Sequence, residues 1–179
     1  MKRVETAAFH RRSMAERIRR ATRLGIAIGL GAAATHAVAV TCTVSTPGLA
    51  FGSYDVFASG VTNGNGTLTV TCSYDSTDTG VINVTYTISL AAGSSNSFVQ
   101  RQMKSGANAF GYNLYTTNAY SVVWGDGTGS TATISGTARL NNGHPSQTNT
   151  HTVYGRIPGL QDVAVASDYQ DNVTVTVTY

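Results

Sequence analysis

Polar and apolar residues alternate strictly in three segments of the chain. A period of two places successive side chains on opposite faces of a strand, so this alternation predicts strands with one buried face. The segments are residues 67–72, 81–90 and 172–179. Their buried faces are expected to hold Leu68, Val70 and Cys72, then Ile82, Val84, Tyr86, Ile88 and Leu90, and finally Val173, Val175, Val177 and Tyr179.

Weaker strand patterns and turn signals occupy the rest of the chain after residue 39. Five further strands are expected, at residues 42–45, 110–115, 121–124, 131–140 and 152–156. Clusters of Gly, Asn, Asp and Pro predict turns between strands, at residues 63–66, 78–80, 125–127 and 142–145. Many short strands separated by turns are typical of a β-sandwich or barrel, so the predicted fold class is all-β.

The beginning of the chain has a different character. Residues 1–23 carry eight basic and two acidic side chains, and eleven uncharged residues, 24–34, follow them. A small-residue Ala-Val-Ala sequence then ends at Ala39. This order is typical of a secretory signal peptide, and the apolar run is shorter than the roughly 18–20 residues that a membrane span requires. We predict a signal peptide over residues 1–39, cleaved before a single domain over residues 40–179.

Removal of this leader changes the charge of the protein. The whole chain has a net charge of +3 at pH 7, but residues 24–179 carry four basic side chains against seven Asp, a net charge of −3. A positive surface supplies most of the affinity for nucleic acid, so nucleic-acid binding is not expected. The start codon, Met1 or Met14, stays open and does not affect the mature chain.

The predicted domain contains two cysteines, Cys42 and Cys72. Two cysteines without a third, in an exported chain, predict one disulfide. Its loop of about 30 residues would stabilise the fold by roughly 3–4 kcal/mol on the loop-entropy model. A metal pair is the alternative, but no nearby His or third Cys supplies the remaining ligands, and no metal is expected.

Residues that could carry catalysis are scarce in the predicted domain. His144 and His151 lie seven positions apart, which is not a metal or catalytic spacing without a further group. The seven Asp are scattered, mostly in turns, and Glu is absent after residue 39. Neither a Gly-x-Ser-x-Gly motif nor a phosphate-binding Gly-rich motif occurs. We therefore expect neither an enzyme nor a cofactor.

The last predicted strand runs to Tyr179. A regular strand that runs to the last residue of a sandwich either lies at a sheet edge or lacks a neighbouring strand. Exposed edges recruit other strands, and one solution is that another chain supplies the missing strand by β-addition.

Seven short motifs, in order, resemble the spore coat protein U (SCPU) domain family, which includes subunits of Csu-type archaic chaperone–usher pili. They are Thr41–Ser45, Phe51–Asp55, Gly66–Cys72, Tyr112–Tyr115, Trp124–Gly127, Val153–Ile157 and Val173–Tyr179. The resemblance implies an incomplete immunoglobulin-like β-sandwich of six strands, whose seventh strand is supplied in trans. It also implies that the Cys42–Cys72 bridge ties the first two strands together.

The same resemblance implies the protein's partners and location. A periplasmic chaperone, and later a neighbouring pilus subunit, would fill the groove left by the missing strand, and an outer-membrane usher would export the subunit. Val173, Val175, Val177 and Tyr179 would form the edge that pairs with the chaperone. The product would be a cell-surface fibre, secreted through the periplasm.

The short segment before Cys42 differs from that expected of a subunit that donates a strand. Donation requires an extended apolar segment before the first cysteine, yet only Val40 and Thr41 precede Cys42 in the predicted mature chain. At roughly 3.3 Å per residue, two residues do not span a neighbour's groove. We therefore expect a strand acceptor, at the tip or in an accessory position, that supports adhesion or biofilm formation.

Two alternatives stay open at this point. The chain is alternatively a secreted spore or cell coat protein that folds alone or pairs with itself. The second alternative is a small carbohydrate-binding β-sandwich that uses Trp124 and surface tyrosines for stacking on a sugar. If Trp124 lies in the core, it has a packing role instead.

Overall fold

The computed structural model describes residues 39–74 and 80–179, so the predicted leader lies outside the described residues apart from Ala39. The described part forms eight strands and one short 3-10 helix, η1, at Gly93–Ser95. The strands are β1 (Val40–Ser45), β2 (Thr62–Tyr74), β3 (Ile82–Leu90), β4 (Arg101–Ser105), β5 (Asn108–Tyr115), β6 (Ile134–Leu140), β7 (Ser146–Ile157) and β8 (Val175–Thr178).

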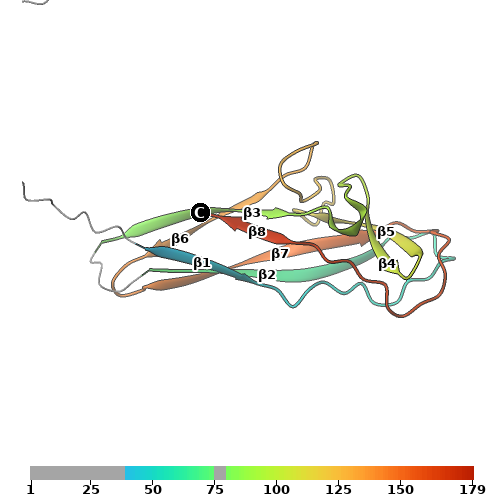
Figure 1. Ribbon diagram of the computed structural model, residues 1–179, viewed down its shortest axis with the longest axis horizontal. Coiled ribbons are helices and arrows are strands. Elements are labelled where there is room, and N and C mark those ends of the chain that lie inside the picture. The colour runs from blue at the N-terminus through green and yellow to red at the C-terminus, as the bar shows by residue number, and fades with distance from the viewer. Residues whose placement is uncertain (1–38, 75–79) are drawn as a thin grey trace, which may run out of the picture. The chain divides into compact units, whose positions relative to one another are not determined.

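The strands form two antiparallel sheets (Figure 1). One sheet has the order β1-β2-β7-β5-β4 and the other has the order β6-β3-β8. The prediction of an all-β sandwich is confirmed. The predicted count of six strands is corrected to eight in the described part of the chain, in part because a β4–β5 hairpin extends the larger sheet beyond β7. Within the described residues, no helix is long and apolar enough to cross a membrane.

The core lies between the sheets, where the predicted alternation placed it. Leu68, Val70 and Cys72 of β2 are at most 1% exposed, and they face Tyr86 and Ile88 of β3, which are equally buried. Residues between them on each strand point outward and are mostly Thr, Ser and Asn. Burial of each large apolar side chain contributes about 1.5–3 kcal/mol, so these central strands dominate the stability of the domain.

The Asn-Gly repeat at residues 63–66 was predicted to be a turn. It is instead part of β2. The segment after β1 crosses the inner face of the larger sheet at this point. A Cβ on Gly64 would lie 2.9 Å from the Ala50 carbonyl oxygen, and one on Gly66 would lie 3.0 Å from the Cβ of Leu49. These glycines therefore provide room for a crossing segment rather than for a chain reversal.

The other local predictions have mixed outcomes. The turns at residues 125–127 and 142–145 are confirmed, whereas most of the turn predicted at residues 78–80 lies outside the described residues. Residues 121–124 form isolated bridges rather than a strand. β4 was not predicted, because its sequence, Arg-Gln-Met-Lys-Ser, does not alternate. The last strand is shorter than predicted, since only Val175–Thr178 pair regularly with β3.

Candidate functional site

The candidate site includes the open edge of β8, an edge strand of the smaller sheet (Figure 1). β8 pairs with β3 alone among the described strands, with Val175 opposite Leu90 and Val177 opposite Ile88. The Ala91 amide donates to the Thr174 carbonyl at 2.9 Å, so the backbone polar groups of Thr174 face β3. Backbone groups alternate in direction along a strand, and those of Val175 and Val177 therefore point to the open edge.

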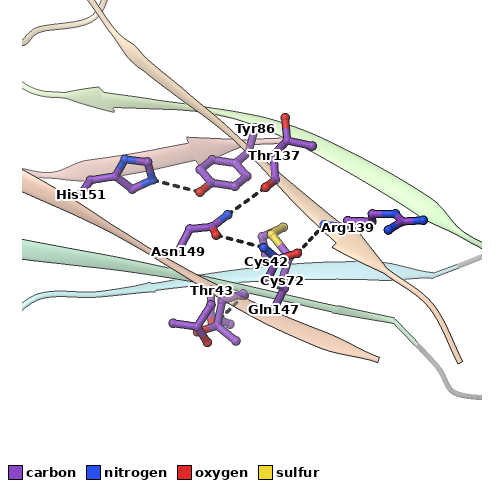
Figure 2. Close-up of a disulfide and its surroundings, with 11 residues drawn as sticks. Cys42, Thr43, Cys72, Tyr86, Thr137, Arg139, Gln147, Asn149 and His151 are labelled. Carbon is purple, nitrogen blue, oxygen red and sulfur yellow. Dashed lines mark hydrogen bonds between the residues drawn. A yellow bond between two sulfur atoms is a disulfide. The ribbon is translucent and has the colours of Figure 1, made fainter. Parts of the chain in front are cut away.

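The edge across the sandwich from β8 is β1, which pairs with β2 alone among the described strands. β1 and β8 contact each other across the interior. The Cys42–Cys72 disulfide joins β1 to β2, and the two cysteines are direct cross-strand partners (Figure 2). The predicted disulfide is confirmed. It holds β1 on the sheet although β1 has a neighbour on one side only among the described strands.

A groove opens between the chain segments that extend from these two edges. One bank is the segment that follows β1, and the other is the segment that leads into β8; the buried core forms the floor. A cleft of about 250 Å³ lies here, and a second of about 640 Å³ continues between the same two banks. The lining of the first cleft includes Leu49 and Phe51 on one bank, Val173 and Val175 on the other, and Leu68, Leu114 and Val153 on the floor.

Side-chain exposure near the β8 and β1 edges differs from that of the buried core. Val173, Val175 and Val177 pack against the core but stay half-buried, and Val44 of β1 is 36% exposed. Ile88, directly opposite Val177, is fully buried. Of the predicted residues, Val173 and Val175 lie together on one bank of the first cleft. Val177 and Tyr179 line neither cleft, and Tyr179 is 55% exposed.

A polar contact fixes the bank that leads into β8. The Asp171 carboxylate accepts hydrogen bonds from the Tyr112 hydroxyl at 2.7 Å and from the amide and hydroxyl of Ser94 at 2.8 and 2.6 Å. Burial and this bond to Asp171 raise the pKa of Tyr112 well above its ordinary range. Gly93 allows the approach, since a Cβ there would meet the carboxylate. Sequence patterns did not predict this contact.

The comparisons with known proteins bear on this architecture. The family model for the spore coat protein U domain matches residues 31–176. The chain belongs to the spore coat protein U domain family. Among solved structures, a chain in the "CsuC-CsuE chaperone-tip adhesion subunit pre-assembly complex from archaic chaperone-usher Csu pili of Acinetobacter baumannii" is similar, at 23% sequence identity and a TM-score of 0.45. The match covers 79% of this chain and 40% of that chain. No curated protein matches.

This SCPU domain also contains a fully buried cation, Arg101, which sequence analysis did not single out. Its guanidinium donates two hydrogen bonds to the Ala91 carbonyl, at 3.1 and 2.8 Å, one to the Trp124 carbonyl at 2.8 Å and one to Asn113 Oδ1 at 2.7 Å. Burial lowers the pKa of Arg101. The cluster ties β4 and β5 to the end of β3, close to the groove.

The histidines of the SCPU domain lie in different surroundings. His144 is exposed in the turn between β6 and β7. His151 Nε2 is 2.9 Å from the hydroxyl of buried Tyr86 (Figure 2), and burial lowers the pKa of His151. No group of three metal-ligating side chains occurs among the described residues.

Trp124 does not serve as a surface stacking residue. Its side chain is 0% exposed, and its indole Nε1 donates to the Ile88 carbonyl at 3.0 Å. The hypothesis that Trp124 stacks on a saccharide is therefore wrong. In the SCPU domain it is a core residue that packs where the two sheets meet.

Proposed function

We propose that the protein is a non-enzymatic structural subunit of a surface fibre, assembled by the chaperone–usher route, and that its groove accepts a β-strand from another chain. The observation that carries the proposal is the edge of β8. There, Val175 lines the groove with a half-buried side chain and Val177 packs half-buried against the core, while the backbone groups of both face an edge without a strand partner among the described residues. An added strand would satisfy those backbone groups and cover the valines at the same time.

The chemistry of the groove supports a particular kind of donor strand. The lining side chains are mostly aliphatic and aromatic, and Asp171 on the bank is already engaged by Tyr112 and Ser94. An extended donor with apolar residues at every second position matches this surface, since such a strand turns one side-chain face into the cleft. A charged residue at an inward position would lose its hydration without gaining a partner.

The partners and location follow from the proposal. A periplasmic chaperone would supply the strand first, a neighbouring subunit would replace it, and an outer-membrane usher would export the product to the cell surface. The predicted signal peptide over residues 1–39 is consistent with this route. We also infer a strand acceptor at the tip or in an accessory position, because β1 begins at Val40, immediately after the predicted cleavage point. Adhesion and biofilm formation are the corresponding roles.

The test uses a synthetic donor peptide of about nine residues, the length of an ordinary strand, with Val or Ile at alternate positions. Added to the oxidised mature chain, the peptide should raise the unfolding temperature, and a scrambled peptide should not. Val175→Asp should abolish this rise because it places a carboxylate in the groove. Thr176→Asp is the matched control, since Thr176 is the exposed neighbour on the same strand and should leave the response intact.

Two results would contradict the proposal. One is a mature chain that unfolds cooperatively as a soluble monomer and gains no stability from the donor peptide. That result would favour the alternative of a secreted coat protein that folds alone. The other is equal loss of the peptide response in Val175→Asp and Thr176→Asp, because a groove that faces one side of β8 predicts a difference between the two.

A further inference from the structure

A second cluster of side chains lies on the outer face of the five-stranded sheet. Val153 lines the groove and Gly155 is buried, so their neighbours on β7, Tyr154 and Arg156, point to the opposite face. Strand register places Tyr115 of β5 and Asn65 of β2 beside Tyr154. We call the cluster formed by Asn63, Tyr115, Tyr120, Tyr154 and Arg156 the tyrosine platform.

Arg156 is held in one orientation within the platform. Its guanidinium carbon lies 3.6 Å from the centroid of the Tyr120 ring, and its Nε donates to Asn63 Oδ1 at 3.0 Å. Stacking and this single bond leave the two terminal nitrogens without a hydrogen-bond partner among the described residues. No carboxylate pairs with Arg156 there, so its charge is available to a ligand.

Tyr120 shows local backbone strain, which also indicates a ligand site. Its φ is +52°, a left-handed value that a bulky residue rarely adopts, and its amide donates to the Thr117 carbonyl at 3.1 Å. Such strain concentrates at ligand sites, where a fixed side-chain position is needed. Here the Tyr120 ring contacts both Tyr115 and Tyr154, at centroid distances of 5.5 and 6.3 Å. The three rings are half-buried, and their hydroxyls make no hydrogen bond within the described part of the chain.

The charge around the platform favours an anionic ligand. The five strands of this sheet contain no Asp or Glu, so no fixed negative charge on these strands competes for Arg156. A planar guanidinium with free terminal nitrogens binds a carboxylate through two parallel hydrogen bonds. Tyrosine rings offer an apolar surface to the C–H face of a sugar ring, and their hydroxyls exchange hydrogen bonds with sugar hydroxyls.

We propose that the tyrosine platform binds an acidic saccharide, with the sugar carboxylate on Arg156 and the sugar ring against the tyrosines. Asn65, an exposed amide opposite Tyr154, supplies a further polar group to the same ligand. The site is distinct from the groove because it lies on the other face of β7. Binding should therefore persist when a donor strand fills the groove.

The test is titration of the oxidised mature chain, with the donor peptide present, with a galacturonic acid tetrasaccharide, followed by NMR or calorimetry. Saturable binding is expected, and the methyl-esterified tetrasaccharide should bind at least about tenfold more weakly because it lacks the carboxylates. Arg156→Gln should cause a similar loss. Arg139→Gln is the matched control, since Arg139 is an exposed arginine on β6 of the other sheet.

A second variant separates binding from folding. Tyr120→Asn removes the ring but keeps a residue that tolerates the left-handed backbone, so the fold should stay intact while binding weakens by about tenfold. The proposal is overturned if the wild-type chain does not bind, if the acid and its ester bind equally, or if Arg139→Gln loses as much affinity as Arg156→Gln. The comparison of the acid with its ester uses the wild-type chain. The proposal can therefore be tested even if Arg156→Gln does not fold.

Discussion

Replacement of Arg101 by Met is expected to destabilise the domain by about 2–3 kcal/mol. The carbonyls of Ala91 and Trp124 accept hydrogen bonds from the guanidinium and from no other described group. The buried Trp124 carbonyl would lose its partner at a cost of about 1–3 kcal/mol. Ala91 is exposed, so water can reach its carbonyl and the loss there is at the lower end of that range, about 1 kcal/mol. Asn113 Oδ1 would keep its bond from the Leu114 amide. Removal of the buried charge offsets part of the loss, which holds the total below the upper bound of about 4 kcal/mol.

The assay is urea unfolding followed by fluorescence of Trp124, the one tryptophan in the chain, which accepts a bond from Arg101. With an m-value of about 2 kcal/mol/M, the midpoint of Arg101→Met should fall by about 1–1.5 M. Lys104→Met is the control on the same strand, where the side chain is exposed, and should change stability by less than about 0.5 kcal/mol. Equal midpoints for Arg101→Met and the wild type would refute the assignment of Arg101 as the group that satisfies both carbonyls.

Two other expectations concern the disulfide and pH. Removal of both cysteines by Cys42→Ala and Cys72→Ala should cost about 3–4 kcal/mol for a closed loop of 30 residues, read as a lower urea midpoint; a midpoint equal to that of the oxidised wild type would contradict it. Burial lowers the pKa of His151, so the unfolded chain binds a proton more readily than the folded domain. Stability should therefore fall as pH drops below about 6.5, the ordinary histidine value. His151→Gln, which keeps a polar partner for Tyr86, should reduce this slope in urea midpoints between pH 7.5 and 5, and an unchanged slope would exclude His151 as its source.

The buried faces of β2 and β3 were predictable because a period of two states directly which side chains face inward. Glycine carries no such information. Gly64 and Gly66 looked like a turn, since glycine suits both chain reversals and close approaches, and the choice between them depends on Leu49 and Ala50, which lie 15 or so positions earlier. A distant segment thus decided a local conformation.

The groove was predictable on one side and not on the other. The valines before and within β8 follow the same period of two as the central strands, so their inward direction could be expected from the sequence. Asp171 could not, because its partners Tyr112 and Ser94 lie 59 and 77 positions away and neither belongs to a recognisable motif. Arg101 is similar, since its burial depends on carbonyls contributed by separate parts of the chain.

The alternation along β7 also separates the two proposed activities. Val153 and Gly155 face the interior beside the groove, and Tyr154 and Arg156 face outward on the tyrosine platform. A donor strand would settle between the sheets and leave the outer face of β7 uncovered. A variant at Val175 should therefore impair strand acceptance without affecting saccharide binding, and Arg156→Gln should do the reverse. If each variant impaired both activities, the two faces would not be independent, and the assignment of strand acceptance to one face and saccharide binding to the other would fail.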